Sequence, residues 1–215
     1  MDTGSEVTME HNRHHVSPAE AFALVPREQF LPADERRNAS SNVPLQIGDG
    51  QTNSQPSTVS DMLGLLDPQP GDRVLDLGSG SGWTTALLGV LVGSRGHVTG
   101  VERYRRLIEQ ARTSLRQAGL GDVGIGNSGD SGDVEFIVAT PGVLGLPEAA
   151  PFDRILVSAG AQTLPRELVA QLRTGGVMVI PVDGEMLRVE RTGAEDGDVA
   201  VTRHGRYRFV PLIRD

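Results

Sequence analysis

Three glycines and one later glutamate are the residues whose types and spacing could bind a cofactor. Gly78, Gly80 and Gly82 follow an apolar run that ends at Leu77, and Glu102 comes about twenty residues further on. Glycine lets a backbone turn tightly and approach a ligand with no Cβ in the way. A carboxylate at that distance is placed to accept hydrogen bonds from both hydroxyls of a ribose. The pattern therefore predicts a site for a ligand that carries a ribose.

The spacing of the glycines separates this loop from a dinucleotide fingerprint. That fingerprint is G-x-G-x-x-G, whereas the order here is G-x-G-x-G, and Trp83 stands where its third glycine would be. The variant spacing, followed by Glu102, resembles motif I and the acidic ribose contact of the Rossmann-like S-adenosylmethionine-dependent methyltransferases. That cofactor has an amino-acid end and a ribose but no phosphate. S-adenosylmethionine is therefore the predicted cofactor, and the alternatives are a nicotinamide or flavin nucleotide, or a loop without a ligand.

A serine hydrolase is excluded by the same loop. Its nucleophile elbow is G-x-S-x-G, with serine at the centre of the five residues. The central residue here is Gly80, and neither Ser79 nor Ser81 has a glycine two residues away on both sides.

Composition excludes several other functions. The chain has 215 residues, enough for one sizeable α/β domain, and its net charge of −8 argues against binding to nucleic acid phosphates. It has no cysteine and hence no disulfide or thiolate site. No apolar run is long enough to span a membrane, and no signal-peptide core is present. His11, His14 and His15 lack further ligands at a suitable spacing, so no metal site is predicted. We expect a cytoplasmic monomer.

The elements that must position the loop follow from hydrophobic periodicity and from turn residues. Ser17-Pro18 with Glu20 predicts a capped helix over 19–24, which Pro26 ends. Further helices are predicted over 57–66, 83–92, 104–118 and 165–172, and a flexible glycine-rich loop over 121–132. Strands are predicted over 73–77, 97–101, 134–138, 154–157 and 177–182, followed by an antiparallel pair over 186–191 and 199–204.

This alternation predicts an α/β fold, a doubly wound and mostly parallel sheet with an antiparallel strand pair at its end. Ligands bind to such sheets beyond the carboxyl ends of the strands. The site is therefore expected just after residues 77, 101, 138 and 157.

Beyond the glycine loop, several segments together resemble the protein-L-isoaspartate O-methyltransferase family. In the leader they are Val25–Pro32 (VPREQFLP) and Pro44–Pro56 (PLQIGDGQTNSQP). In the core they are Pro70–Gly82, Val101–Arg103, Pro151–Val157 and Leu172–Val182, and Arg208–Leu212 (RFVPL) follows. The resemblance implies one methyltransferase domain over 16–215, after a flexible stretch at 1–15. Residues 16–56 would form a leader, or lid, on the substrate side, and 57–215 the Rossmann-like core.

The family methylates the side carboxylate of an isomerised aspartate, so that the ester collapses to a succinimide. The resemblance gives Ser54 the role of contacting that carboxylate, with Val210 and Leu212 shaping the peptide groove. Ser54 would position the acceptor and would not be a nucleophile, because a carboxylate is already ionised at pH 7 and the task is alignment. Cofactor contacts are predicted at Thr52, Asn53, Gly78, Ser79, Gly80, Gly82, Glu102, Arg103 and Thr140.

Four departures from the family pattern stand out. Ala139-Thr140-Pro141 replaces Gly-Asp-Gly after the third strand, so Thr140 would be a neutral partner for adenine. Asn53 replaces isoleucine and would add a polar group beside the reaction centre. The stretch Ser158–Gln162 differs from an alanine-rich turn, and residues 1–15 stand where the family has its first helix.

Two rivals to isoaspartate repair follow from these departures. One is a tailoring enzyme that esterifies a normal aspartate in a dedicated peptide. The other is a non-catalytic member that keeps the fold and the groove.

Overall fold

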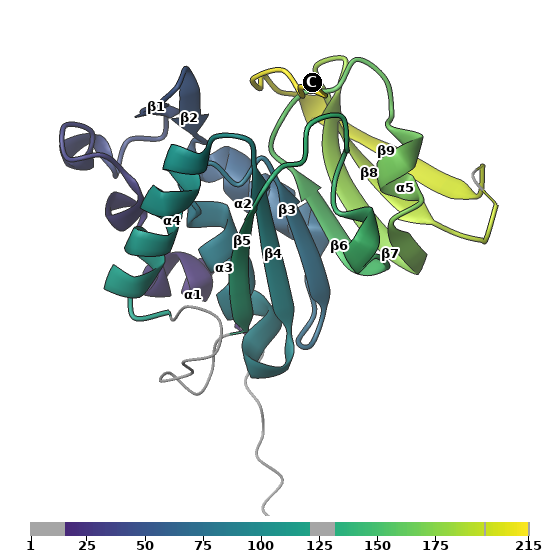
Figure 1. The fold of residues 1–215 in the computed structure, drawn as a ribbon, viewed down its shortest axis with the longest axis horizontal. Helices are drawn as coiled ribbons and strands as arrows, with labels where there is room; N and C mark the ends of the chain where they lie inside the picture. Colours follow the sequence, from purple (N-terminus) through teal and green to yellow (C-terminus); the bar gives the residue numbers. More distant parts are fainter. Residues whose placement is uncertain (1–15, 121–131, 196, 215) are drawn as a thin grey trace, which may run out of the picture.

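The computed structural model describes residues 16–120, 132–195 and 197–214. Its centre is a seven-stranded sheet in the order β5-β4-β3-β6-β7-β8-β9 (Figure 1). The strands are β3 Arg73–Leu77, β4 His97–Glu102, β5 Asp133–Val138, β6 Phe152–Val157, β7 Leu172–Val182, β8 Glu185–Arg191 and β9 Val199–Arg206. The pairs from β5 to β7 are parallel, and β8 and β9 are antiparallel additions. The predicted α/β fold with an antiparallel strand pair at its end is confirmed.

The chain order reverses at β3, which pairs with β4 on one side and with β6 on the other. Leu77, the last residue of β3, stands in register with Val101 and with Val157. The carboxyl ends of these three strands therefore lie level at one edge of the sheet. This is the switch point where a doubly wound sheet leaves room for a ligand.

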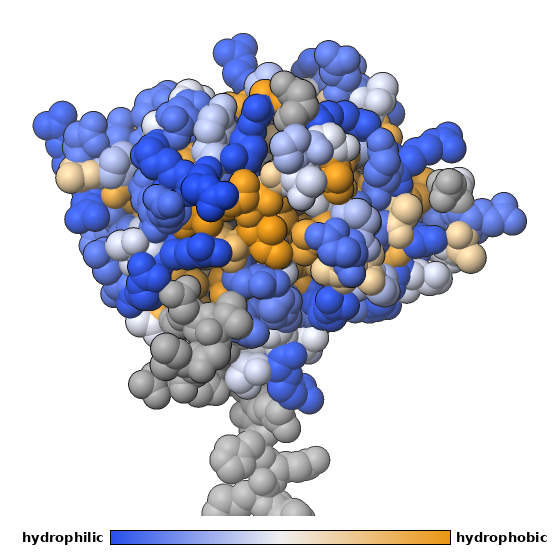
Figure 2. Space-filling view, viewed as in Figure 1, coloured by the Kyte–Doolittle hydropathy of each residue, from blue (hydrophilic) through white to orange (hydrophobic). Residues whose placement is uncertain are grey.

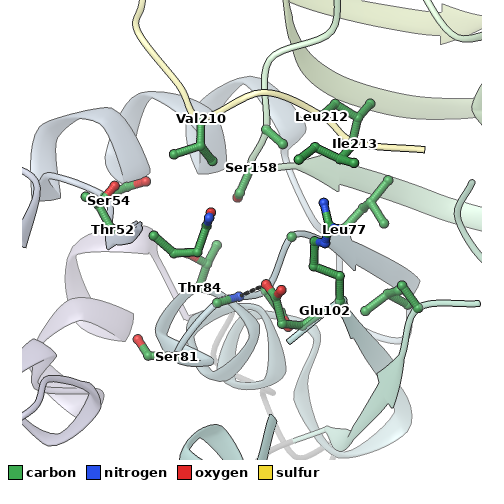
Figure 3. Close-up of a pocket in the computed structure, with 18 of the residues that line it drawn as sticks. Thr52, Ser54, Leu77, Ser81, Thr84, Glu102, Ser158, Val210, Leu212 and Ile213 are labelled. Carbon is green, nitrogen blue, oxygen red and sulfur yellow. Dashed lines mark hydrogen bonds between the residues drawn. The ribbon is translucent and has the colours of Figure 1, made fainter. Parts of the chain in front are cut away.

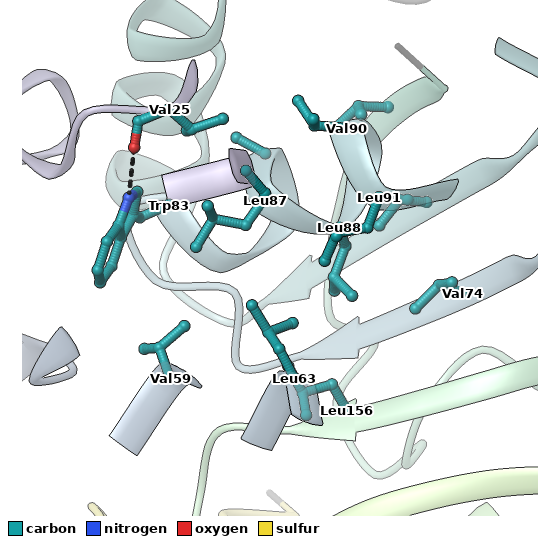
Figure 4. Packing of buried hydrophobic residues seen from close by; sticks show 14 of the residues in the cluster. Val25, Val59, Leu63, Val74, Trp83, Leu87, Leu88, Val90, Leu91 and Leu156 are labelled. Atoms are coloured by element: carbon teal, nitrogen blue, oxygen red, sulfur yellow. Dashed lines mark hydrogen bonds between the residues drawn. The ribbon is translucent and has the colours of Figure 1, made fainter. Parts of the chain in front are cut away.

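The two faces of the sheet are covered unequally. Alternate residues of a strand point to opposite faces, so Val74 packs with one hydrophobic cluster and Leu75 with another. The first cluster includes residues from four helices, and Figure 4 shows its side chains around α3. These helices are α1 Pro18–Leu24, α2 Pro56–Leu66, α3 Trp83–Val92 and α4 Arg105–Gln117.

The second face has much less helical cover. Its cluster takes helical residues only from α5, Arg166–Val169, among the residues that the structure describes. Figure 2 shows an apolar area over β5, at the edge of the sheet, within a mostly hydrophilic surface. The connection that follows β5 holds only the 3-10 helix η4, Pro147–Ala149.

The leader is more ordered than the sequence suggests. The predicted capping box at Ser17 and Glu20 is present and starts α1. After the 3-10 helices η1 Arg27–Phe30 and η2 Arg36–Asn38 comes a hairpin of β1 Leu45–Gly48 and β2 Gln51–Asn53. This hairpin lies beside the upper end of α4 (Figure 1). Outside the leader, a further 3-10 helix, η3 Gly93–Arg95, joins α3 to β4.

One predicted element is wrong, and two others lie outside the described residues. The helix expected over 165–172 is only Arg166–Val169, because Leu172 begins β7 and pairs with Phe152 of β6. Its apolar spacing matched a helix, but the sheet buries Leu172 completely. The expected flexible stretches at 1–15 and over all but the last residue of 121–132 fall outside the described part. The strand expected over 177–182 begins five residues earlier, because β7 runs from Leu172 to Val182. The other predicted helices and strands are present, with small differences at their ends.

Candidate active site

A pocket opens at the carboxyl edge of the sheet, where the sequence placed it. It encloses about 920 Å³, counting the part that is open to solvent. Its lining comes from residues 51–54, 77–81, 83–84, 101–103, 139, 143–144, 158–159 and 210–213. Figure 3 shows Thr52 and Ser54 at one side, Glu102 below, and Val210 and Ser158 between Ser54 and Leu212. Segments far apart in sequence thus share one cavity.

The glycine loop is shaped by its backbone. The N–H groups of Gly78 and Ser79 both donate to the carbonyl of Val101, at 2.8 and 3.2 Å. Gly78 has φ 82° and Gly80 has φ 53°, in the left-handed region that glycine enters without steric cost. The N–H of Gly80 donates to Glu102 Oε2 at 3.0 Å. The loop is thereby fixed to the end of β4.

Glu102 is held in place by two backbone N–H groups and can still accept hydrogen bonds from a ligand. Its Oε1 accepts the N–H of Tyr104 at 3.0 Å, and its Oε2 accepts that of Gly80. A carboxylate has about four lone-pair positions, so two remain for hydroxyl donors. The side chain lines the pocket and is 6% exposed. The two free acceptor positions fit the two hydroxyls of a ribose.

Gly82 stands outside the pocket lining, although the sequence placed it among the cofactor contacts. It is the N-cap of α3 with φ 87°. A Cβ there would meet Ala111 Cβ at 2.8 Å and Phe136 Cζ at 2.9 Å. The third glycine of the loop therefore allows α3 to start close to α4 and β5.

Trp83 anchors the glycine loop to the leader. Its indole N–H donates to the carbonyl of Val25 at 3.0 Å, as Figure 4 shows. The ring meets Phe22 edge to face at 5.4 Å and lies 5.4 Å from the guanidinium carbon of Arg27. It is 2% exposed, and it also contributes to the pocket wall.

Asp76 is completely buried beneath the loop. Its Oδ2 accepts the hydroxyl of Thr85 at 2.6 Å, and Oδ1 has no partner among the described residues. Burial raises its pKa from 3.8 to about 7, the hydrogen bond from Thr85 opposes the rise, and the charge of Glu102 adds to it. Ser79 Oγ is a second buried oxygen without a partner in the described part of the chain. Unpaired buried atoms are rare, and ordered water or a polar ligand commonly satisfies them.

Arg27 holds the leader together from inside. The five N–H groups of its guanidinium reach six acceptors, Asn53 Oδ1 at 2.7 Å and five backbone carbonyls, so one N–H is shared between two of them. The carbonyls are those of Ala39, Ser41, Val43, Asn53 and Ser54. None of these acceptors is a carboxylate, and burial lowers the arginine's pKa from 12.5 to about 10. The group remains charged at pH 7, and carbonyl dipoles stabilise it.

Asn53 has a different place from the one its sequence position suggested. It is 6% exposed, and its amide accepts from Arg27 and donates to Ser81 Oγ at 3.2 Å. Both polar ends are therefore engaged within the protein, although the residue contributes to the pocket wall. The expected extra polar group beside the reaction centre is instead a link between the leader and the glycine loop.

Ser54 follows this link and lines the pocket. Its carbonyl accepts from Arg27 at 2.9 Å, which fixes the backbone below the hydroxyl. Val210 and Leu212 line the same pocket. Gly160 holds their segment in place: its N–H donates to the carbonyl of Val210, and its carbonyl accepts from Leu212 N, both at 2.8 Å. Thus the predicted substrate residues Ser54, Val210 and Leu212 share the cavity with the glycine loop.

Of the remaining predicted cofactor contacts, two line the pocket and one lies outside it. Thr52 and Arg103 line the pocket, and Arg103 also lies over the ring of Tyr104. Thr140 is exposed and outside the lining, where its neighbour Ala139 contributes instead. Sequence reasoning assigned no role to Ser158, Ala159, Val143, Leu144 or Ile213, which also line the cavity. The rule that ligands bind beyond strand ends pointed to Ser158, which directly follows β6.

No metal-binding group of three or more His, Asp or Glu residues occurs in the described part of the chain. The histidines at 11, 14 and 15 lie outside it. Within the described ranges, no helix has the length and apolar character of a membrane span.

The sheet has the strand ends of β3, β4 and β6 at one edge, a glycine loop after β3, and Glu102 bound to that loop. These are the features of a Rossmann-like methyltransferase. The sequence model described as Protein-L-isoaspartate(D-aspartate) O-methyltransferase (PCMT) matches residues 7–215. The chain therefore belongs to the protein-L-isoaspartate(D-aspartate) O-methyltransferase family, as its motifs indicated.

Known proteins agree with this assignment. The protein-L-isoaspartate O-methyltransferase of Methanopyrus kandleri is 44% identical over 199 residues, which cover 91% of this chain and 82% of that protein. The enzyme of the same name from Aeropyrum pernix is 46% identical over 198 residues, 90% of this chain and 71% of that protein. A Plasmodium falciparum structure, assigned as the same enzyme and in complex with S-adenosyl-L-homocysteine, superposes with a TM-score of 0.77 at 22% identity. It covers 94% of this chain and 93% of the other.

Proposed function

We propose that this protein transfers a methyl group from S-adenosylmethionine to the free carboxylate of L-isoaspartyl residues in peptides or proteins. The observation that carries the proposal is a single cavity lined both by the glycine loop with Glu102 and by Ser54 with Val210 and Leu212. Family membership, and relatives named for this activity, support it.

The residues present fit the cofactor. Gly78 and Gly80 provide a turn without side chains, Glu102 has free lone pairs for ribose hydroxyls, and Ser79 Oγ is buried without a partner among the described residues. When bound, S-adenosylmethionine would supply a methyl group activated by its positively charged sulfur, and S-adenosylhomocysteine would be the leaving group.

The protein's own task is then to align the two reactants. A carboxylate needs no general base at pH 7, and holding reacting atoms in line is itself worth a large rate factor. Ser54 would donate its hydroxyl hydrogen to the acceptor carboxylate, with its backbone held by Arg27. Residues 16–56 would act as the substrate-side leader that brings Ser54 over the pocket.

The test is an assay with labelled S-adenosylmethionine and matched peptides that carry isoaspartate or aspartate at one position. We expect methyl transfer to the isoaspartyl peptide and little to the aspartyl one. Glu102→Gln should mainly weaken cofactor binding, and Ser54→Ala should mainly lower kcat. Equal or preferred transfer to normal aspartate would replace repair by peptide tailoring. A lack of S-adenosylhomocysteine binding by calorimetry would indicate a non-catalytic member.

Asn53 raised the possibility of tailoring. That its amide bonds to Arg27 and to Ser81 supports the choice of repair as the proposed function. A monomeric state, a cytoplasmic location and the absence of nucleic acid partners stay predictions.

A further inference from the structure

A second, smaller pocket adjoins the active site on the side of Ser54. The two pockets share Thr52, Ser54, Ser158 and Val210, which therefore form the boundary between them. The glycine loop and Glu102 line only the first pocket. The second pocket thus extends from the predicted acceptor position away from the cofactor loop.

The chemistry of this second pocket differs from that of the first. Most of its side chains are neutral and polar, among them Gln55 and Thr58. Its lining, which lies within the described ranges, includes one charged side chain, that of Arg208. Arg208 is exposed, and no hydrogen bond or ion pair to another described residue satisfies it. A guanidinium in this setting is available to an anion from outside.

The reacting carboxylate is a poor candidate for that anion. It must lie in the first pocket, in line with the methyl donor, and pairing with a guanidinium would withdraw electron density from the attacking oxygen. A neighbouring residue of the same peptide is better placed. Extended chain advances about 3.3 Å per residue, and the second pocket is only about 390 Å³, counting its open part. Because Ser54 and Arg208 line the same small pocket, a peptide whose isoaspartate lies at Ser54 would bring an adjacent residue toward Arg208.

Resting on the proposed function, we propose that Arg208 is a specificity-determining residue that selects isoaspartyl peptides with a glutamate or aspartate next to the damaged residue. The attraction between Arg208 and the acidic residue acts only at short range. The protein's net charge of −8 would repel an acidic peptide from afar, but charges more than about 8–10 Å apart are largely screened at physiological salt. An ion pair at an exposed site contributes little binding free energy, so we expect the peptide with Glu to exceed the peptide with Gln by about two- to fivefold in kcat/KM.

The experiment compares isoaspartyl peptides of one sequence with Glu, Gln or Lys directly before or after the isoaspartate. Wild type should prefer Glu over Gln and Gln over Lys on at least one side, mainly through KM, and the preference should shrink at high salt. Arg208→Gln should remove the order, and Arg208→Glu should reverse it. Arg206→Gln is the matched control, since Arg206 is also exposed but lines neither pocket. It should keep the wild-type order.

The outcomes separate this inference from the function on which it rests. If wild type methylates no isoaspartyl peptide, the proposed function fails. If it methylates all of them equally well, or if Arg208→Gln keeps the order, only the specificity is refuted. A fall in kcat that is equal for every peptide would also overturn it, because Arg208 would then act on the reacting carboxylate.

Discussion

The glycine loop and the 51–54 segment face each other across the pocket, but different forces hold them. The loop is set by backbone conformation and by N–H groups that donate to Val101 and Glu102. The 51–54 segment is held mainly by side chains: the buried Arg27 bonds to Asn53 and to the Ser54 carbonyl, and the Asn53 amide donates to Ser81. The difference teaches that the cofactor side is held by backbone geometry, whereas the acceptor side depends on side-chain contacts, above all the one with Arg27.

The largest expected effect comes from breaking that contact. Arg27→Met should lower the free energy of unfolding by about 4 kcal/mol, because buried carbonyls lose a charged donor. Urea denaturation measures the loss. The exposed Arg37→Met in the same leader should change stability by less than about 0.5 kcal/mol. Similar effects for the two variants would mean that Arg27 is not what fixes the leader.

Beneath the loop, Asp76 should make stability depend on pH. An unfolded Asp loses its proton near pH 3.8, whereas folded Asp76 keeps it to about pH 7. The folded state therefore binds more protons between those values, and stability falls as pH rises through that window. Between about pH 5 and pH 8 we expect wild type to lose roughly 3 kcal/mol more than Asp76→Asn does. Parallel pH curves in denaturant titrations would contradict the buried, protonated state.

A third test asks whether Gly82 is needed for packing. Gly82→Ala should cost about 2 kcal/mol, from its positive φ and from the close approach to Ala111 and Phe136. Gly71→Ala isolates the backbone component, since Gly71 has φ 92° with open space around it. Its cost should be about 1 kcal/mol. Thermal denaturation of both variants gives the difference, and equal costs would argue against the packing role.

The smallest effect is expected at Asn53, where leader and loop meet. Asn53→Ile should cost about 1 kcal/mol, because Arg27 Nε loses its acceptor while apolar burial offsets part of the loss. Ser81→Ala removes only the second hydrogen bond of Asn53 and should cost less. If Asn53→Ile were neutral, the side-chain hydrogen bonds of Asn53 would contribute no net stability, and the bonds from Arg27 to the carbonyls of Asn53 and Ser54 would remain the main support of the acceptor side.

The same contrast explains what the sequence could predict. The glycine loop and Glu102 can be predicted from the sequence because the turn and the strand that follows constrain both their residue types and their spacing. The burial of Arg27 is not visible, because no local pattern tells which six acceptors a distant arginine will reach. The hydrogen bonds of Asn53 could not be predicted for the same reason, since its partners come from the loop before α3 and from η1, although the residue does line the pocket. Thr140 was placed by its motif position, but the chain turns its side chain to solvent.

The prediction of helix length was limited in the same way. Over 83–92 the apolar run and the flanking glycines predict α3 with its observed ends. At Leu172 the helical spacing and the strand pairing compete, and the partner strand β6 decides the outcome. Tertiary pairing of this kind overrides local preference and is read only from the folded protein.

The wall that carries Val210 and Leu212 also sets an order of events during synthesis. These residues follow β9, which ends at Arg206, so they leave the ribosome after every strand of the sheet. A nascent chain can close the sheet and shape the glycine loop before the wall opposite Ser54 exists. Competence to recognise a substrate would then arise only after the cofactor side has formed.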